Sequence, residues 1–96
     1  TVTEYRRDLA RSHGNLGVAL GESDPAAALA SCEAARAIFQ ELVDDHPTVT
    51  EYRRDLAGSL LGLADLQSET GDVARALASY DAARATQQRL VEDHPE

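Results

Sequence analysis

The sequence predicts an all-α protein built from two stacked copies of one antiparallel helix hairpin, with four helices of about 20 residues each. Ten residues, TVTEYRRDLA, begin at Thr1 and recur verbatim at Thr48, and a His-Pro dipeptide closes each copy. Repetition over 20 to 50 residues is typical of stacked supersecondary units. Apolar residues in each copy also recur with helical spacing, not with the two-residue spacing of a strand. We therefore assign repeat 1 to 1–47 and repeat 2 to 48–95, together one piece of a larger array.

The first helix of each repeat is expected to begin at a capping box. Thr1 and Thr48 each stand three residues before a glutamate, Glu4 or Glu51, and in this spacing each side chain accepts a hydrogen bond from the backbone N–H of the other residue. One apolar stripe follows on each helix, and we expect it to be buried. The stripes consist of Val2, Tyr5, Leu9, Leu16 and Leu20, and of Val49, Tyr52, Leu56, Leu60, Leu63 and Leu66.

A break at 21–24 and another at 68–72 separate the first helix of each repeat from the second. An aspartate ends each break and can cap the next helix, and Pro25 suits a first helical turn. The second helices should end before His46-Pro47 and before His94-Pro95, because proline cannot continue a helix. Their predicted inner faces are Ala28, Cys32, Ala35, Phe39 and Leu42, and Ala76, Tyr80, Ala83, Gln87 and Leu90.

The charge of the chain restricts its partners. Nine arginines face 17 acidic residues, which gives a formal net charge of -8. Nucleic acids and anionic membranes are therefore unfavourable partners, since both attract clustered cations. The only cysteine, Cys32, has no intramolecular partner for a disulfide, which is consistent with a reducing, cytoplasmic compartment. No apolar stretch approaches the 18 or so residues that cross a bilayer.

The segments around the two breaks resemble the tetratricopeptide repeat (TPR) family. The resemblance is carried by NLGVAL, DPAAALASCEAA and LADLQSETGDVARALASYDAA, which contain a Leu-Gly or Leu-Ala pair, a Gly-Asp turn and small residues around an aromatic one. Cys32 departs from this aromatic place, and the first break has no counterpart of the turn glycine. The positions that match the family's packing signature are Leu16, Gly17, Ala28, Ala35, Leu63, Ala64, Gly71, Ala76, Tyr80 and Ala83.

Each repeat is longer than the roughly 34 residues usual for the family. We assign the surplus to the start of the first helix and the end of the second, which meet at the same end of an antiparallel hairpin. The chain thus resembles the long repeats of 47 to 48 residues found in kinesin light chains and in bacterial TPR arrays. The resemblance implies an α-solenoid, in which small residues allow close approach of the helix axes.

We expect no enzymatic activity, no cofactor and no metal site. Ser12 and His13 are adjacent in sequence, but consecutive helical residues point about 100° apart, so we interpret His13 as a partly buried packing residue. Cys32 is expected to pack as a small buried residue and not to act as a reactive thiol. The repeated segment Glu4–Asp8 is interpreted as a solvated, charged helix face, with a contact surface as the alternative.

The resemblance implies a protein-protein interaction scaffold that binds a peptide or helix on the concave surface of its first helices. The residues that the resemblance places on this surface, here called the expected groove residues, are Arg11, Asn15, Val18, Leu61 and Asp65, and Gly14, Gly58 and Gly62 share their helix faces. The carboxylate-binding clamp of chaperone adaptors is largely missing. A neutral or basic partner with an apolar anchor should therefore bind better than an acidic tail.

The alternative is a structural segment that assembles with copies of itself. Repeat arrays usually need about three units and polar end caps. Val2, Tyr5 and Leu9 at one end, and Leu90 and Val91 at the other, should lack partners. Exposed apolar ends of this kind favour self-association.

Overall fold

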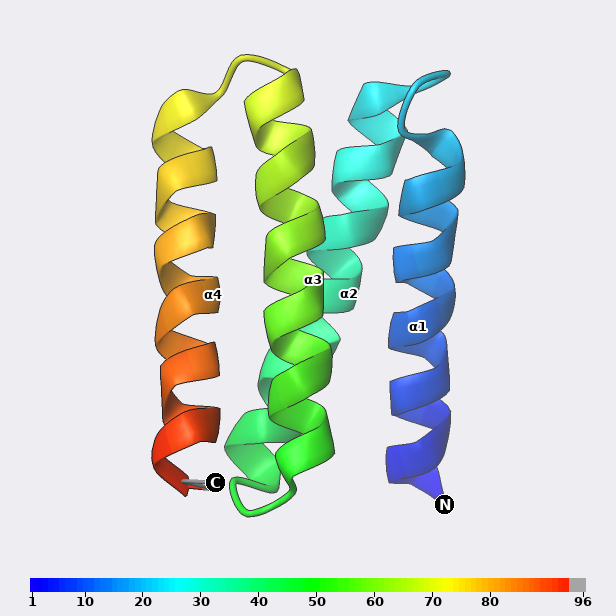
Figure 1. Cartoon of the computed structure of the whole chain (residues 1–96). Helices are drawn as coiled ribbons and strands as arrows, with labels where there is room; N and C mark the ends of the chain where they lie inside the picture. Colours follow the sequence, from blue (N-terminus) through cyan, green and yellow to red (C-terminus); the bar gives the residue numbers. More distant parts are fainter. Residues whose placement is uncertain (94–96) are drawn as a thin grey trace.

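Four antiparallel helices form the computed structural model of the chain, which describes residues 1–93 (Figure 1). They are α1 (Val2–Leu20), α2 (Pro25–Asp45), α3 (Thr50–Glu69) and α4 (Val73–Asp93). Each helix packs on its neighbours in sequence, so that α2 contacts α1 and α3, and α3 contacts α4. The prediction of an all-α protein with four helices of this length is confirmed. His94 and Pro95, which we expected to end the last helix, lie outside the described residues.

The two capping boxes predicted from sequence have different outcomes. At Thr1 both hydrogen bonds of the box are present, and the Glu4 amide donates to the Thr1 hydroxyl over 3.2 Å. The prediction for Thr48 is wrong, because α3 begins at Thr50 with Val49 as an N-cap that makes no side-chain bond. Here the chain turns directly out of α2, and the Val49 N–H donates to the His46 carbonyl over 3.1 Å. This turn occupies the residues that the capping box would use.

The turns within the two hairpins differ at Gly71, which has no counterpart in the first turn. Asp24 and Asp72 cap the following helices as predicted, each accepting a backbone hydrogen bond of 3.1 Å, from Ala27 and Arg75. Gly71 has φ +87°, a conformation that side-chain-bearing residues rarely adopt. The first turn needs no such residue, since Gly21 continues in the right-handed helical region at φ -45°.

Two clusters of buried side chains hold the helices together, and α2 contributes to both. The larger cluster contains Ala10, Ala35, Phe39, Leu42, Leu56, Leu60 and Ala83, and therefore joins all four helices. The smaller one contains Ala28, Cys32, Leu63 and Leu66, near the turns of the hairpins. All five residues of the predicted inner face of α2 are buried. On α4 only Ala76 and Ala83 of the five predicted residues are buried, while Tyr80 and Gln87 are exposed and Leu90 is half-buried.

Small residues of the predicted packing signature do lie at the helix contacts. A Cβ at Gly17 would stand 2.5 Å from Cys32 Sγ and 3.2 Å from the Ala28 carbonyl oxygen, so α1 approaches α2 closely only because this position has no side chain. Ala28, Ala35, Ala64, Ala76 and Ala83 are also at most 3% exposed. Three signature residues are exposed instead: Leu16 at 49%, Tyr80 at 37%, and Gly71 in the turn.

The apolar stripes of α1 and α3 have opposite environments although their sequences correspond. Leu56 in α3 is 3% exposed, whereas its copy Leu9 in α1 is 52% exposed. The expectation of a buried stripe is therefore correct for the four leucines of α3, Leu56, Leu60, Leu63 and Leu66, whereas Val49 and Tyr52 are half-buried. It is wrong for α1, where four stripe residues are exposed and Leu20 is half-buried, because α3 packs on α2 and no described helix packs on the same face of α1. Val2, Tyr5 and Val91 are exposed, as the analysis of the ends predicts.

The interpretation of the repeated charged segment as a solvated face is wrong for three of its arginines. Arg6 pairs with Glu41 and Asp45 of α2 at 3.1 and 3.4 Å. Its copy Arg53 is 8% exposed and pairs with Asp93. Arg7 crosses from α1 to α3. The alternative reading, a contact surface, describes these arginines better, but the contacts lie between helices of this chain.

Candidate binding groove

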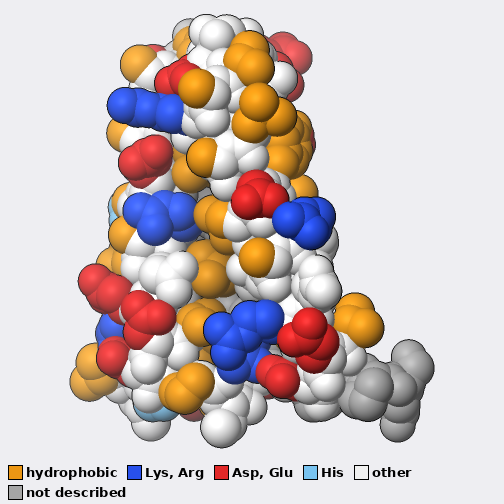
Figure 2. All heavy atoms as spheres, turned by 90° about the vertical axis from the view of Figure 1, so that its left-hand side faces the viewer, with side chains coloured by type: hydrophobic (Ala, Val, Ile, Leu, Met, Phe, Trp, Pro, Cys, Tyr) orange, Lys and Arg blue, Asp and Glu red, His pale blue; other side chains and the backbone are white. Residues whose placement is uncertain are grey.

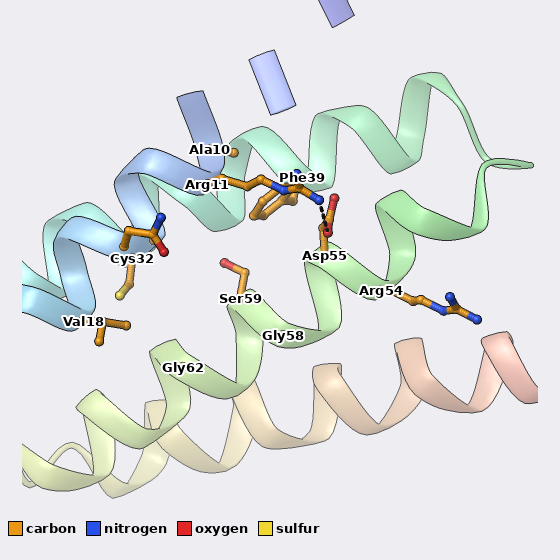
Figure 3. A pocket seen from close by; sticks show the side chains of 12 residues that line it. Ala10, Arg11, Val18, Cys32, Phe39, Arg54, Asp55, Gly58, Ser59 and Gly62 are labelled. Atoms are coloured by element: carbon orange, nitrogen blue, oxygen red, sulfur yellow. Dashed lines mark ion pairs between the residues drawn. The ribbon is translucent and has the colours of Figure 1, made fainter. Parts of the chain in front are cut away.

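A groove runs between α1 and α3, and two adjoining hollows of about 460 and 480 Å³ form it. Both hollows include Val18, Cys32 and Gly62, so they are continuous along the helices. Residues of α2 close its base, as Phe39 and Cys32 show in the close view (Figure 3). The groove is thus built by the first helices of both repeats over the second helix of repeat 1.

Glycines keep the walls of the groove low. A Cβ added at Gly14, Gly58 or Gly62 would meet no other atom within 4 Å. These three glycines therefore are not required for packing within the described chain. Because they carry no side chain, a bound segment could approach the helix backbones closely. The main apolar side chain offered to such a segment is Val18, which is 81% exposed.

A shared carboxylate connects the two helices at one end of the groove. Asp55 of α3 accepts a hydrogen bond from Arg7 Nε at 2.6 Å and lies 3.9 Å from Arg11 Nη2 (Figure 3). The hydrogen bond to Asp55 raises the pKa of Arg7, so this guanidinium stays charged at every physiological pH. Arg7 also lies over the ring of Tyr52, 5.7 Å from its centroid. Arg7, Arg11 and Asp55 therefore largely neutralise one another, whereas Arg54, which also lines the first hollow, has no ion pair within residues 1–93.

The other end of the groove is acidic. Glu22, Asp65 and Glu69 line the second hollow, and no arginine does. Asp65 accepts a hydrogen bond from the Tyr80 hydroxyl of α4. This hydrogen bond, with some desolvation and the nearby carboxylates, raises the pKa of Tyr80. The three carboxylates favour a cationic group of a ligand at this end.

The structure brings four of the five expected groove residues together. Arg11, Asn15 and Val18 line the first hollow, and Val18 and Asp65 line the second. Leu61 is not among the lining residues, because it is half-buried and packs against the larger core cluster. Gly14, Gly58 and Gly62 also line the groove.

Several groove residues were not predicted. Asp55, Ser59, Glu22 and Glu69 line the hollows and were not selected from the sequence. Asp55 could have been found, since it precedes Gly58 by three residues and Gly62 by seven, the spacing of one helix face. Glu22 lies in the turn after α1, where helical periodicity gives no guidance.

Cys32 lies at the base of the groove but presents little surface to it. It is 6% exposed, and burial raises the pKa of its thiol. A buried thiol with a raised pKa is a poor nucleophile. Residues 1–93 also contain no group of three or more His, Cys, Asp or Glu side chains arranged to hold a metal ion.

Neither a protein-family model, nor a curated protein, nor a solved structure matches this chain. Among the described helices, none is long and apolar enough to cross a membrane.

Proposed function

We propose that this chain is a TPR-like segment of an α-solenoid and a non-enzymatic scaffold that binds a peptide or helix of a partner protein in the groove between α1 and α3. The observation that carries the proposal is the composition of the groove, in which the first helices of both repeats face one continuous hollow across unobstructed glycines. Solenoid proteins use concave surfaces of this kind to bind extended or helical segments.

The charges of the groove indicate the chemistry of the partner. Asp55 pairs with Arg7 and lies 3.9 Å from Arg11, which leaves Arg54 as the one arginine of the first hollow without an ion pair among the described residues. Glu69 and Glu22 at the opposite end have no hydrogen bond or ion pair in the described part of the chain. A partner segment with an apolar side chain against Val18 and a lysine or arginine directed at the hollow of Glu22, Asp65 and Glu69 would suit both features.

The proposal can be tested with two synthetic 16-residue peptides that share a central leucine and differ only in carrying lysines or glutamates around it. Fluorescence anisotropy with the intact chain should show saturable binding of the lysine peptide, at least about tenfold tighter than binding of the glutamate peptide. Equal or tighter binding of the glutamate peptide would contradict the proposed selectivity. Binding of neither peptide by the folded chain would contradict the groove as a peptide site.

Two matched substitutions separate groove binding from adhesion to the acidic surface. Gly62→Leu places a side chain in the open space of the groove, and we expect affinity for the lysine peptide to fall at least about tenfold. Ala78→Leu adds a similar side chain at an exposed position of α4 outside the groove and should leave the affinity unchanged. Equal losses in the two variants would show that the peptide binds elsewhere.

A further inference from the structure

Two faces at opposite ends of the helix row carry exposed apolar side chains. The first, which we call the α1 end face, consists of Val2, Tyr5, Leu9 and Leu16, between 49% and 74% exposed. The second, the α4 end face, consists of Val73, Leu77, Tyr80 and Val91, between 37% and 66% exposed. Figure 2 views the side of the molecule on which α4 lies and shows hydrophobic side chains there among arginines and carboxylates.

The contact between α2 and α3 shows how such faces fit together. The α1 end face is the sequence copy of the α3 surface that packs on α2: Leu9 corresponds to Leu56 and Leu16 to Leu63, and both α3 leucines are at most 3% exposed. The α4 end face likewise corresponds in sequence to the surface of α2 that carries Leu29 and Val43. Leu77 corresponds to Leu29 and Val91 to Val43, and both α2 residues pack against the core clusters.

We propose that the α4 end face of one copy of this chain binds the α1 end face of a second copy, in the register of the contact between α2 and α3. The two faces are different, so the contact is head-to-tail and leaves one free face at each end of a dimer. Further copies can then add, and the product is an open series of oligomers.

Charge complementarity supports this register. Within the chain, Arg7 of repeat 1 pairs with Asp55 of repeat 2 and lies over the ring of Tyr52. Arg54 is the sequence copy of Arg7, and Asp8 and Tyr5 are the copies of Asp55 and Tyr52. In the proposed contact, Arg54 of one copy therefore pairs with Asp8 of the second copy and lies over its Tyr5. Arg54 and Asp8 are exposed and have no hydrogen bond or ion pair within residues 1–93. Arg54 points away from the pair of Arg11 and Asp55, as this role requires (Figure 3).

Two differences make this contact weaker than the one inside the chain. Phe39 of α2 is replaced by Gln87 on the α4 end face, and Leu60 of α3 by His13 on the α1 end face. Both replaced residues belong to the larger core cluster. The net charge of -8 also opposes association of identical chains. The association should therefore be reversible and should depend on concentration.

The head-to-tail geometry can be tested with one variant blocked at each face. Leu9→Asp blocks the α1 end face, Leu77→Asp blocks the α4 end face, and both positions are exposed, so circular dichroism should show unchanged helix content. In sedimentation velocity at 0.15 M salt, wild-type chain should form species larger than a dimer as concentration rises. Each variant alone should be monomeric, and their equimolar mixture should form a heterodimer and nothing larger. Ala82→Asp, at an exposed position on another side of α4, should behave like wild type.

The register is tested separately by charge reversal. Arg54→Asp and Asp8→Arg should each weaken association of the wild-type chain about fivefold or more, and the chain carrying both changes should recover to within about twofold of wild type. Arg75→Asp changes the net charge by the same amount as Arg54→Asp at a position off both end faces, and it should have a smaller effect.

Three results would overturn the proposal. If the wild-type chain stays monomeric up to about 1 mM, specific self-association is excluded, because any remaining contact would be weaker than most known specific ones. Dimerisation of either blocked variant alone would show a symmetric contact in place of a head-to-tail one. Failure of the double charge swap to restore association would exclude the register. The peptide site in the groove is assayed on the monomeric Leu9→Asp and Leu77→Asp variants, whose substituted residues lie outside both hollows. Arg54 itself lines the first hollow, so Arg54→Asp is used for the association assay alone.

Discussion

Arg7 of α1 donates a hydrogen bond from its Nε to Oδ2 of Asp55 in α3 over 2.6 Å, although helix α2 lies between the two in sequence. Their side chains are 26% and 16% exposed, so solvent screens this pair less than a surface ion pair. The pair joins the first helices of the two repeats at one end of the groove. It thus contributes to the spacing on which the groove depends.

Asp55→Asn should destabilise the fold by about 1 to 2 kcal/mol, because it leaves Arg7 partly buried without its anionic partner. The same loss should be smaller in 1 M salt, where the remaining electrostatic interactions are screened. Urea unfolding followed by circular dichroism measures both effects. Asp81→Asn breaks an ion pair with Arg84 whose side chains are 70% and 72% exposed, and it should leave the unfolding midpoint unchanged. Similar midpoints for the two variants would contradict the structural role of Asp55.

The two copies of one leucine should differ in their contribution to stability. Leu56→Ala removes a side chain that is 3% exposed and should cost about 2 to 4 kcal/mol, through lost burial and the cavity left behind. Leu9→Ala changes the corresponding residue at 52% exposure and should cost less than about 1 kcal/mol in the monomer. Unfolding at a concentration where the chain is monomeric measures this difference. Equal costs would contradict the exposed position of Leu9 in the monomer.

The helical glycines should respond to alanine with opposite signs. Gly62→Ala meets open space and should stabilise the fold by about 0.5 to 1 kcal/mol, the difference in helix propensity between the two residues. Gly17→Ala would place a methyl group 2.5 Å from Cys32 Sγ and 3.2 Å from a backbone oxygen, so α1 must move away from α2 and stability should fall by about 1 to 3 kcal/mol. Thermal unfolding of both variants checks the sign. A stabilising Gly17→Ala would contradict the close approach of α1 to α2.

Tyr80 should ionise at a higher pH than is usual for a tyrosine. Its hydroxyl donates to Asp65, which raises the pKa of Tyr80 above the usual value of 10.0. Since the folded state favours the protonated phenol, the stabilisation from this bond is fully present below pH 10 and is lost as the pH rises through the raised pKa. Ultraviolet titration of a chain carrying Tyr5→Phe and Tyr52→Phe isolates Tyr80. Asp65→Asn should lower its titration midpoint, and an unchanged midpoint would exclude the bond as the cause.

Local patterns in the sequence predicted the elements of this fold. The helices follow from the spacing of apolar residues, and the caps at Asp24 and Asp72 follow from residues whose side chains accept local backbone bonds. The buried face of α2 was also predictable, because that helix has neighbours on both sides. The capping box that was predicted at Thr48 does not form, because the turn that leaves α2 uses the same residues, and this shows the limit of local rules.

The candidate groove was predictable in part, for a similar reason. Arg11, Val18 and Asp65 line the hollows, but Leu61, which was expected beside them, turns into the core. A residue at the edge of a helix face lies about as close to the core as to the groove, and the position of the neighbouring helix decides between them. Asp55 was missed because its importance lies in its distance from Arg7, a residue of the other repeat.

The sequence by itself therefore determined the repeat, the four helices, the turn glycine at Gly71 and the acidic charge of the surface. The tertiary structure alone decided that one copy of the stripe is buried at Leu56 and the other is exposed at Leu9. It also decided that Arg7 reaches Asp55. The physical reason is that secondary structure depends on residues a few positions apart, whereas burial and ion pairing depend on which helix lies alongside.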